Sequence, residues 1–182
     1  MKKVKILAIV FSLLLIGCFA PVRPSKQSSV PDGFRGIKWG TEISTLTDME
    51  KVEQEESSNN DLVWYKRKGD KLAIGKASLK GIFYGFWMGN FESVWIDFEG
   101  DDNFESLKKE LFEQFGKVRE SVKEFYAWGG KDTEMSLSYS RDRRNGILSI
   151  DSIKFSEERR AYDKQKEKEK REKEGGILKF KF

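Results

Sequence analysis

Apolar and polar residues alternate strictly in two stretches of this sequence. Residues 92–100 (ESVWIDFEG) place Val94, Ile96 and Phe98 on one side of an extended chain, and residues 134–140 (EMSLSYS) set three large side chains against three serines. A period of two residues is typical of strands in an antiparallel sheet that has one buried face. We therefore expect such a sheet to form the framework of the fold.

One clear helix and several further strands are expected around these stretches. Between Asp101 and Phe115, apolar residues recur at helical spacing, with acidic residues before them and Gly116 after them. We expect the whole apolar stripe to be buried (Phe104, Leu107, Leu111, Phe112 and Phe115). A short helix is expected at 41–49, and strands at 34–40, 62–66, 71–74, 79–88, 124–128 and 146–155.

The predicted fold class is α+β, a twisted and mostly antiparallel sheet packed against one or two helices. Residues 33–155 form a single domain of ordinary size in this prediction. A helix followed by strands occurs twice within it, which indicates two similar halves related by element order rather than by repeated letters. A charged C-terminal extension follows the domain.

The N-terminus has the features of an export signal. Three lysines precede an apolar run of twelve residues, 6–17, which is shorter than the ~20 residues that a membrane-spanning helix needs. Residues 15–18 (LIGC) resemble the lipobox of bacterial lipoproteins. The resemblance implies cleavage after Gly17, a lipid on Cys18 and attachment to a membrane through that lipid. An ordinary secretory signal with an incidental cysteine is the alternative.

Residues 18–32 are expected to form a flexible tether, because they contain all three prolines of the chain and a polar stretch. Phe19 stands where an aspartate would retain a lipoprotein at the inner membrane, so the resemblance favours the periplasmic face of the outer membrane. The stretch GIKWGTEISTL resembles the opening of small outer-membrane-assembly lipoproteins of the SmpA/OmlA type. The body as a whole resembles uncharacterised exported proteins that share the motif FRGIxWG.

Charge and composition argue against several functions. Removal of residues 1–17 leaves 31 basic and 30 acidic residues, so the electrostatic basis for nucleic-acid binding is missing and no nucleic-acid partner is expected. The chain has no histidine, and Cys18 is its only cysteine. We expect no cofactor, no metal and no catalytic residue. Four carboxylates at 97–102 would suit a Ca²⁺ site or a hydrolase, but a solvated strand end is the simpler interpretation (Asp97, Glu99, Asp101 and Asp102).

Aromatic residues are abundant in the expected strands and have two interpretations, a core or a binding platform (Trp64, Trp87, Trp95, Trp128, Tyr65, Tyr84 and Tyr126). Trp95 is the informative one, since it lies opposite the apolar face of its strand. Either a second layer covers it or it is exposed for a partner.

The C-terminal region divides into two parts. Residues 156–176 are rich in charges of both signs at i,i+4 spacing, which predicts a solvated helix or a disordered spacer that ends at Gly175 and Gly176. Residues 177–182 (ILKFKF) are built as a short strand, with Leu178, Phe180 and Phe182 on one side. This tail resembles the terminal strand of outer-membrane barrel proteins, and self-pairing, partner binding and disorder all remain open.

The expected function is that of a lipid-anchored, non-catalytic cell-envelope protein that binds another envelope protein. Candidate contacts for the partner are Trp95, Leu178, Phe180 and Phe182. Binding of a glycan or of peptidoglycan through exposed aromatics is the alternative, and a hydrolase that depends on carboxylates is the third hypothesis.

Overall fold

The computed structural model describes residues 30–53 and 61–178, without the side chains of residues 175–178. Residues 1–29, with Cys18, and residues 179–182, with Phe180 and Phe182, lie outside the described residues. In chain order the elements are β1 (Gly33–Phe34), β2 (Ile37–Lys38), η1 (Ile43–Thr45), β3 (Met49–Lys51), β4 (Leu62–Arg67), β5 (Ala73–Ile74), β6 (Ala77–Ser78), β7 (Gly81–Trp87), β8 (Asn90–Glu99), α1 (Asp101–Phe115), β9 (Glu120–Val122), β10 (Phe125–Gly129), β11 (Thr133–Ser140), β12 (Asn145–Ser152) and α2 (Ile153–Leu178).

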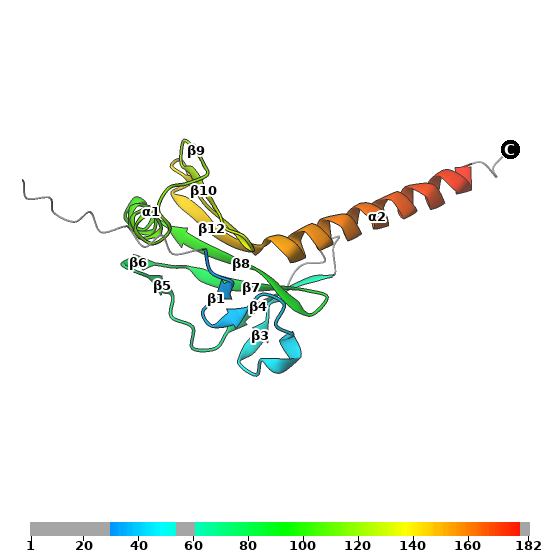
Figure 1. Cartoon of the computed structure of the whole chain (residues 1–182), viewed down its shortest axis with the longest axis horizontal. Coiled ribbons are helices and arrows are strands. Elements are labelled where there is room, and N and C mark those ends of the chain that lie inside the picture. Colours follow the sequence, from blue (N-terminus) through cyan, green and yellow to red (C-terminus); the bar gives the residue numbers. More distant parts are fainter. Residues whose placement is uncertain (1–29, 54–60, 179–182) are drawn as a thin grey trace, which may run out of the picture.

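Eight strands form one antiparallel sheet in the order β3-β4-β7-β8-β12-β11-β10-β9 (Figure 1). The last strands of the two halves, β8 and β12, pair at its centre. Each half contributes four strands to this sheet after a helical element: η1 precedes β3, β4, β7 and β8, with the separate β5–β6 hairpin between them, and α1 precedes β9 to β12. The α+β class is therefore confirmed, whereas the short helix expected at 41–49 is only the three-residue 3-10 turn η1, and Met49 already belongs to β3.

The core lies on one face of this sheet, between the strands and α1. Val94, Ile96 and Phe98 of β8 are at most 1% exposed, and the residues that pair with them on β7 and β12 are buried with them. The segment around β1 and β2 covers the same face, where the Trp39 ring packs 4.8 Å from that of Phe91. Each half of the sheet is thus closed on one side by a different part of the chain.

The helix α1 has the predicted limits, but not every residue of its apolar stripe is buried. Phe104, Leu107 and Leu111 are buried, whereas Phe112 is 37% exposed and Phe115 is half-buried. Neighbouring helical residues point about 100° apart, so Phe112 cannot share the direction of Leu111. Its ring instead contacts the edge of the sheet at Trp128, 5.4 Å between centroids. The expectation that Phe112 is a core residue was wrong.

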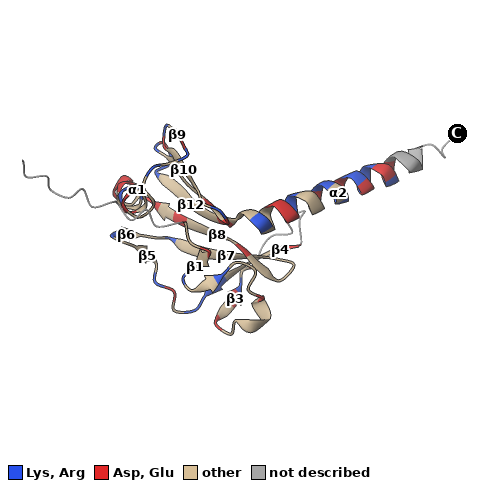
Figure 2. Cartoon of the chain, in the orientation of Figure 1, with Lys and Arg blue, Asp and Glu red and all other residues tan. Residues whose placement is uncertain are grey.

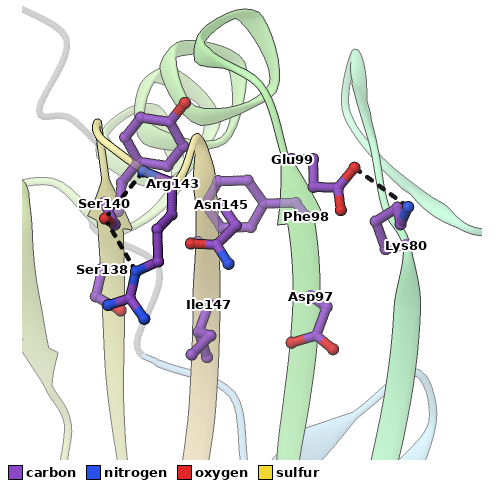
Figure 3. A pocket seen from close by; sticks show the side chains of 11 residues that line it. Lys80, Asp97, Phe98, Glu99, Ser138, Ser140, Arg143, Asn145 and Ile147 are labelled. Carbon is purple, nitrogen blue, oxygen red and sulfur yellow. Dashed lines mark hydrogen bonds and ion pairs between the residues drawn. The ribbon is translucent and has the colours of Figure 1, made fainter.

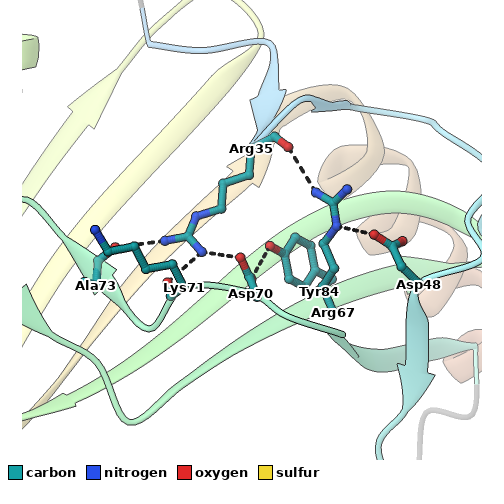
Figure 4. A network of polar contacts seen from close by, with 7 residues as sticks. All are labelled: Arg35, Asp48, Arg67, Asp70, Lys71, Ala73 and Tyr84. Carbon is teal, nitrogen blue, oxygen red and sulfur yellow. Dashed lines mark hydrogen bonds and ion pairs between the residues drawn. The ribbon is translucent and has the colours of Figure 1, made fainter.

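The motif FRGIKWG is held by a network of polar contacts (Figure 4). Arg35 has a positive φ of 47°, and its guanidinium donates to the Lys71 carbonyl at 2.8 Å and pairs with Asp70. Asp70 also accepts a hydrogen bond from the Tyr84 hydroxyl at 2.6 Å, and burial raises the pKa of that tyrosine. Arg67 completes the network by donating to the Arg35 carbonyl at 3.2 Å. The motif therefore fastens the N-terminal segment to the sheet.

The end of β12 differs from the predicted strand 146–155. The strand stops at Ser152 and α2 begins at Ile153, because the Ser152 hydroxyl accepts the Phe155 N–H at 3.5 Å as a helix cap. The helix then continues through Gly175 and Gly176, where we expected a break, to Leu178. The backbone of Leu178 is therefore helical, not extended as predicted.

The helix α2 crosses one end of the sheet and then leaves it. Its first turns contact β8 through Arg159 and β7 through Tyr162, and Lys166 donates to Asp61 at 2.7 Å just before β4. From there it projects beyond the body, with basic and acidic side chains alternating along it (Figure 2). Within residues 30–53 and 61–178, no helix has both the length and the apolar character needed to cross a membrane.

Candidate functional site

The second face of the sheet carries the candidate site. Along β11 and β12 buried residues alternate with partly exposed ones, and α1 and the β1–β2 segment cover only the first face. Trp95 on β8 is 41% exposed. The structure therefore answers the question left by the sequence, since no second layer from the described chain covers Trp95. We call this surface the open face; it includes Trp64, Phe83, Trp95, Phe125 and Ile147 with Asp97, Ser136, Ser138 and Ser149.

Two glycines of β7 allow aromatic rings to lie on the open face. A Cβ at Gly85 would stand 3.0 Å from the Trp64 ring, and one at Gly81 would stand 2.8 Å from the Phe83 ring. Both rings therefore lie over bare backbone, where any larger residue would displace them. Such pairing of a strand glycine with an aromatic ring protects the exposed backbone.

Trp95 completes a cluster with these rings. Its ring meets the edge of Trp64 at 6.5 Å between centroids and an interplanar angle of 78°. Its indole N–H donates to Asp97 Oδ1 at 2.6 Å, which fixes the orientation of the ring. We call Trp64, Phe83 and Trp95 the aromatic platform. A preorganised aromatic surface binds a ligand with little loss of conformational entropy.

A pocket of about 490 Å³ lies at one end of the open face (Figure 3). Three neighbouring strands form most of its walls: β8 with Asp97 and Glu99, β12 with Asn145 and Ile147, and β11 with Ser138 and Ser140. The remaining lining residues are Lys80, Phe98, Tyr139, Arg143 and Gly146. The Lys80 ammonium lies 3.2 Å from Glu99. Asp97 links the pocket to the aromatic platform, because it lines the pocket and accepts a hydrogen bond from the Trp95 indole N–H.

A cluster of acids lies at the opposite end, beneath the start of α2. Glu92 is the extra residue of a β-bulge, because Gly85 pairs with Ser93 while Phe86 pairs with Phe91. Its side chain is fully buried and accepts Arg159 Nε at 2.7 Å. Burial raises the pKa of Asp151 on β12 to about 6, and the charges of nearby acids add to this rise.

The other residues singled out from the sequence lie elsewhere. Trp87, Trp128 and Tyr84 are buried, and Tyr65 and Tyr126 pack against the core cluster. Of the aromatics named from the sequence, only Trp64 and Trp95 lie on the open face.

The four acids at the end of β8 are not brought together as one site. Asp97 faces the pocket, Glu99 pairs with Lys80, and Asp101 accepts the Tyr139 hydroxyl at 3.0 Å. Asp102 is exposed in the first turn of α1. In the described parts of the chain, no group of three acidic, histidine or cysteine residues could hold a metal ion.

Several residues of the site were missed from the sequence. The stretch GIFYGFW carries a usable signal for Gly81, Phe83 and Gly85. Glycines that alternate with aromatic residues in a strand mark rings that lie over the strand backbone. No local pattern marks Asn145 and Arg143, which lie where the chain turns from β11 into β12. Their role in the pocket depends on the pairing of β12 with β8, which places Asn145 opposite Glu99.

Comparison with known proteins adds nothing to this geometry. No protein-family model, no curated protein and no solved structure matches the chain. The likeness to lipoproteins therefore rests on residues 15–18 and on the short motifs alone.

Proposed function

We propose that this chain is a lipid-anchored, non-catalytic cell-envelope protein that binds another envelope protein through the open face. The observation that supports this most is the exposure of Trp95 on the sheet face that residues 30–53 and 61–178 leave open around it; its side chain is 41% exposed and is oriented by Asp97. Tryptophan is enriched among the residues that dominate protein–protein binding energies. The separate contacts made by the acids of residues 97–102 favour a binding role over a hydrolase.

The size of the open face suits a protein partner. The face spans six strands, from β4 to β10, which lie about 4.8 Å apart and are about seven residues long. These dimensions give a projected area of roughly 600 Å². A stable interface buries about 800 Å² on each partner. The aromatic cluster of the open face and the charged residues at its ends also match the apolar centre and polar rim of such interfaces.

The proposed anchor is compatible with free access to this face. The chain enters the body at Val30 and Pro31, where the Thr133 hydroxyl donates to the Pro31 carbonyl at 2.5 Å. Thr133 and its partner Ser152 lie at one end of β11 and β12, while the pocket lies at the other. About seven residues of strand, roughly 24 Å, separate these ends. A tether from a lipid on Cys18 would therefore join the body at the end opposite the pocket.

Replacement of the anchor residue should release the protein. We expect Cys18→Ser to abolish incorporation of labelled palmitate and to move the protein from the membrane fraction to the soluble fraction, because serine lacks the thiol to which the lipid would be attached. Fractionation after a high-salt wash measures this. Lys26→Ser in the same tether is the matched control and should change nothing. A serine variant that stays with washed membranes would contradict the proposal.

Loss of the platform should abolish partner capture. We expect Trp95→Ser to remove the envelope proteins that cross-link to the chain in cells, whereas Leu72→Ser, which alters a residue 48% exposed outside the open face, should leave them. Quantitative mass spectrometry of cross-linked material measures the effect, and purified sacculi provide a second assay. Equal capture by both variants argues against the open face. Unchanged protein capture together with Trp95-dependent pelleting on sacculi supports the glycan alternative.

The C-terminal residues are the second proposed contact. Truncation after Leu178 removes Phe180 and Phe182, and the same cross-linking assay tests whether they bind the partner. Loss of cross-links with an unchanged melting temperature is the result expected for partner binding.

A further inference from the structure

We propose that the pocket between Asp97 and Arg143 binds a neutral saccharide, with one sugar ring stacked on Trp95. This inference goes beyond the proposed protein binding, which needs only the aromatic platform and the open face. The pocket has about 490 Å³, within the range of small-ligand sites, and its lining residue Asp97 accepts a hydrogen bond from the exposed Trp95 indole.

The charge of the pocket points to a neutral ligand. Lys80 and Arg143 supply two positive charges, and Asp97 and Glu99 supply two negative ones. Lys80 and Glu99 already pair with each other at 3.2 Å. A strongly anionic or cationic ligand would meet a like charge in the same small volume, so the balance favours a molecule without net charge.

The polar groups of the pocket match a ligand rich in hydroxyl groups. Asp97 has a carboxylate that accepts hydrogen bonds, Arg143 donates, and the Asn145 amide does both. Ser138 and Ser140 add hydroxyls from β11. Each hydroxyl of a sugar is both a donor and an acceptor, so alternating donors and acceptors around the walls can satisfy neighbouring hydroxyls of one ring. Figure 3 shows these side chains arrayed along the open side of β11, β12 and β8.

Trp95 supplies the apolar part of such a site. Trp95 and Asp97 are two residues apart on β8 and point to the same side, about 7 Å from each other along the strand. The hydrogen bond between them, 2.6 Å, holds the indole still. A ring seated on the indole therefore has its hydroxyls within reach of Asp97 and the pocket. The apolar Ile147 side chain forms part of the same wall.

The test uses the full mature chain with Cys18→Ser, so that it can be purified without detergent. The probes are two neutral tetrasaccharides, the β-1,4-linked N-acetylglucosamine tetramer and maltotetraose, together with an oligogalacturonate of the same length as a charged probe. The chain has five tryptophans, and the Trp95 indole N–H signal in the NMR spectrum is assigned with Trp95→Phe. We expect one neutral tetrasaccharide to shift this signal saturably.

Variants decide whether the pocket carries the binding. Asp97→Asn keeps an acceptor for the indole, and Asn145→Ala removes one wall of the pocket. Each substitution should raise the dissociation constant by roughly five- to tenfold, the effect of losing one good hydrogen bond. Asp142→Asn, exposed on the neighbouring turn and outside the pocket, should bind like the parent. Circular dichroism confirms that each variant is folded.

Three outcomes overturn the inference. One is the absence of a saturable shift with either neutral probe, another is equal affinity of the Asn145→Ala variant, and the third is binding of the charged probe alone. Protein cross-linking that depends on Trp95 would still support the proposed function in the first two cases. Loss of cross-linking with retained saccharide binding would instead overturn the protein partner and leave the pocket site standing.

Discussion

Phe104→Ala should lower the free energy of unfolding by about 3–5 kcal/mol, the usual cost of removing a buried phenylalanine ring. Phe104 is completely buried, and its ring is stacked on that of Tyr139 at 4.5 Å between centroids with an interplanar angle of 8°. It joins α1 to β11, so the cavity left by alanine would lie between the helix and the sheet. Urea denaturation followed by circular dichroism measures the change.

Phe112→Ala on the same helix is the matched control for this prediction. Phe112 is 37% exposed and contacts Tyr126 and Trp128 only through ring edges, so its removal should cost about 1 kcal/mol. The two substitutions change helix propensity in the same way, and the difference between them reports burial alone. Equal losses for the two variants would contradict the packing of α1 described above.

Local patterns in the sequence were sufficient for much of this fold. The alternation in residues 92–100 is a property of one strand, and β8 has the predicted buried side, with Val94 and Ile96 both at most 1% exposed. The helix at Asp101–Phe115 is bounded by signals within a few residues of its ends, including Gly116 with φ of 69°. Such patterns depend only on neighbouring residues, so one sequence can reveal them.

Features that depend on distant residues were not predictable in this way. The extra residue at Glu92 is visible only once β7 and β8 are aligned, because nothing in the local pattern marks it. The role of Arg35 depends on carbonyls 36 and 38 residues away, at Lys71 and Ala73. Long-range contacts of this kind arise from tertiary structure, which local periodicity does not encode.

The candidate site, too, was predictable from the sequence only in part. The outward direction of Trp95 followed from its position in an alternating strand, yet its exposure required knowledge that α1 covers only the other face. The pocket combines Asp97, Ser138 and Asn145 from three strands, and their proximity follows from the order β8-β12-β11. A strand order in which β12 is inserted beside β8 could not be derived from the separate strands.

Arg159→Ala should destabilise the protein by about 2–4 kcal/mol, because it leaves the carboxylate of Glu92 buried without a positive partner. The Glu92 side chain is completely buried, and Arg159 Nε lies 2.7 and 3.0 Å from its two oxygens. Arg159 itself is 25% exposed, so the expected loss lies below that of a fully buried ion pair. Thermal and urea unfolding of the single variant measure it, with Arg160→Ala, an exposed neighbour on α2, as the control.

The double variant Glu92→Gln/Arg159→Ala separates the ion pair from its surroundings. A neutral glutamine can still accept a hydrogen bond from Ser156, whose hydroxyl lies 3.2 Å from Glu92 Oε1, so the penalty of an unpaired charge disappears. We therefore expect the double variant to be more stable than Arg159→Ala alone, and the cycle completed with Glu92→Gln alone gives the coupling energy of the pair. If the double variant instead loses as much stability as the two single variants together, the charges do not interact. The direction of α2 would then be set by the contact of Tyr162 with Trp87, at 5.9 Å between ring centroids, and by the start of the helix at Ser152.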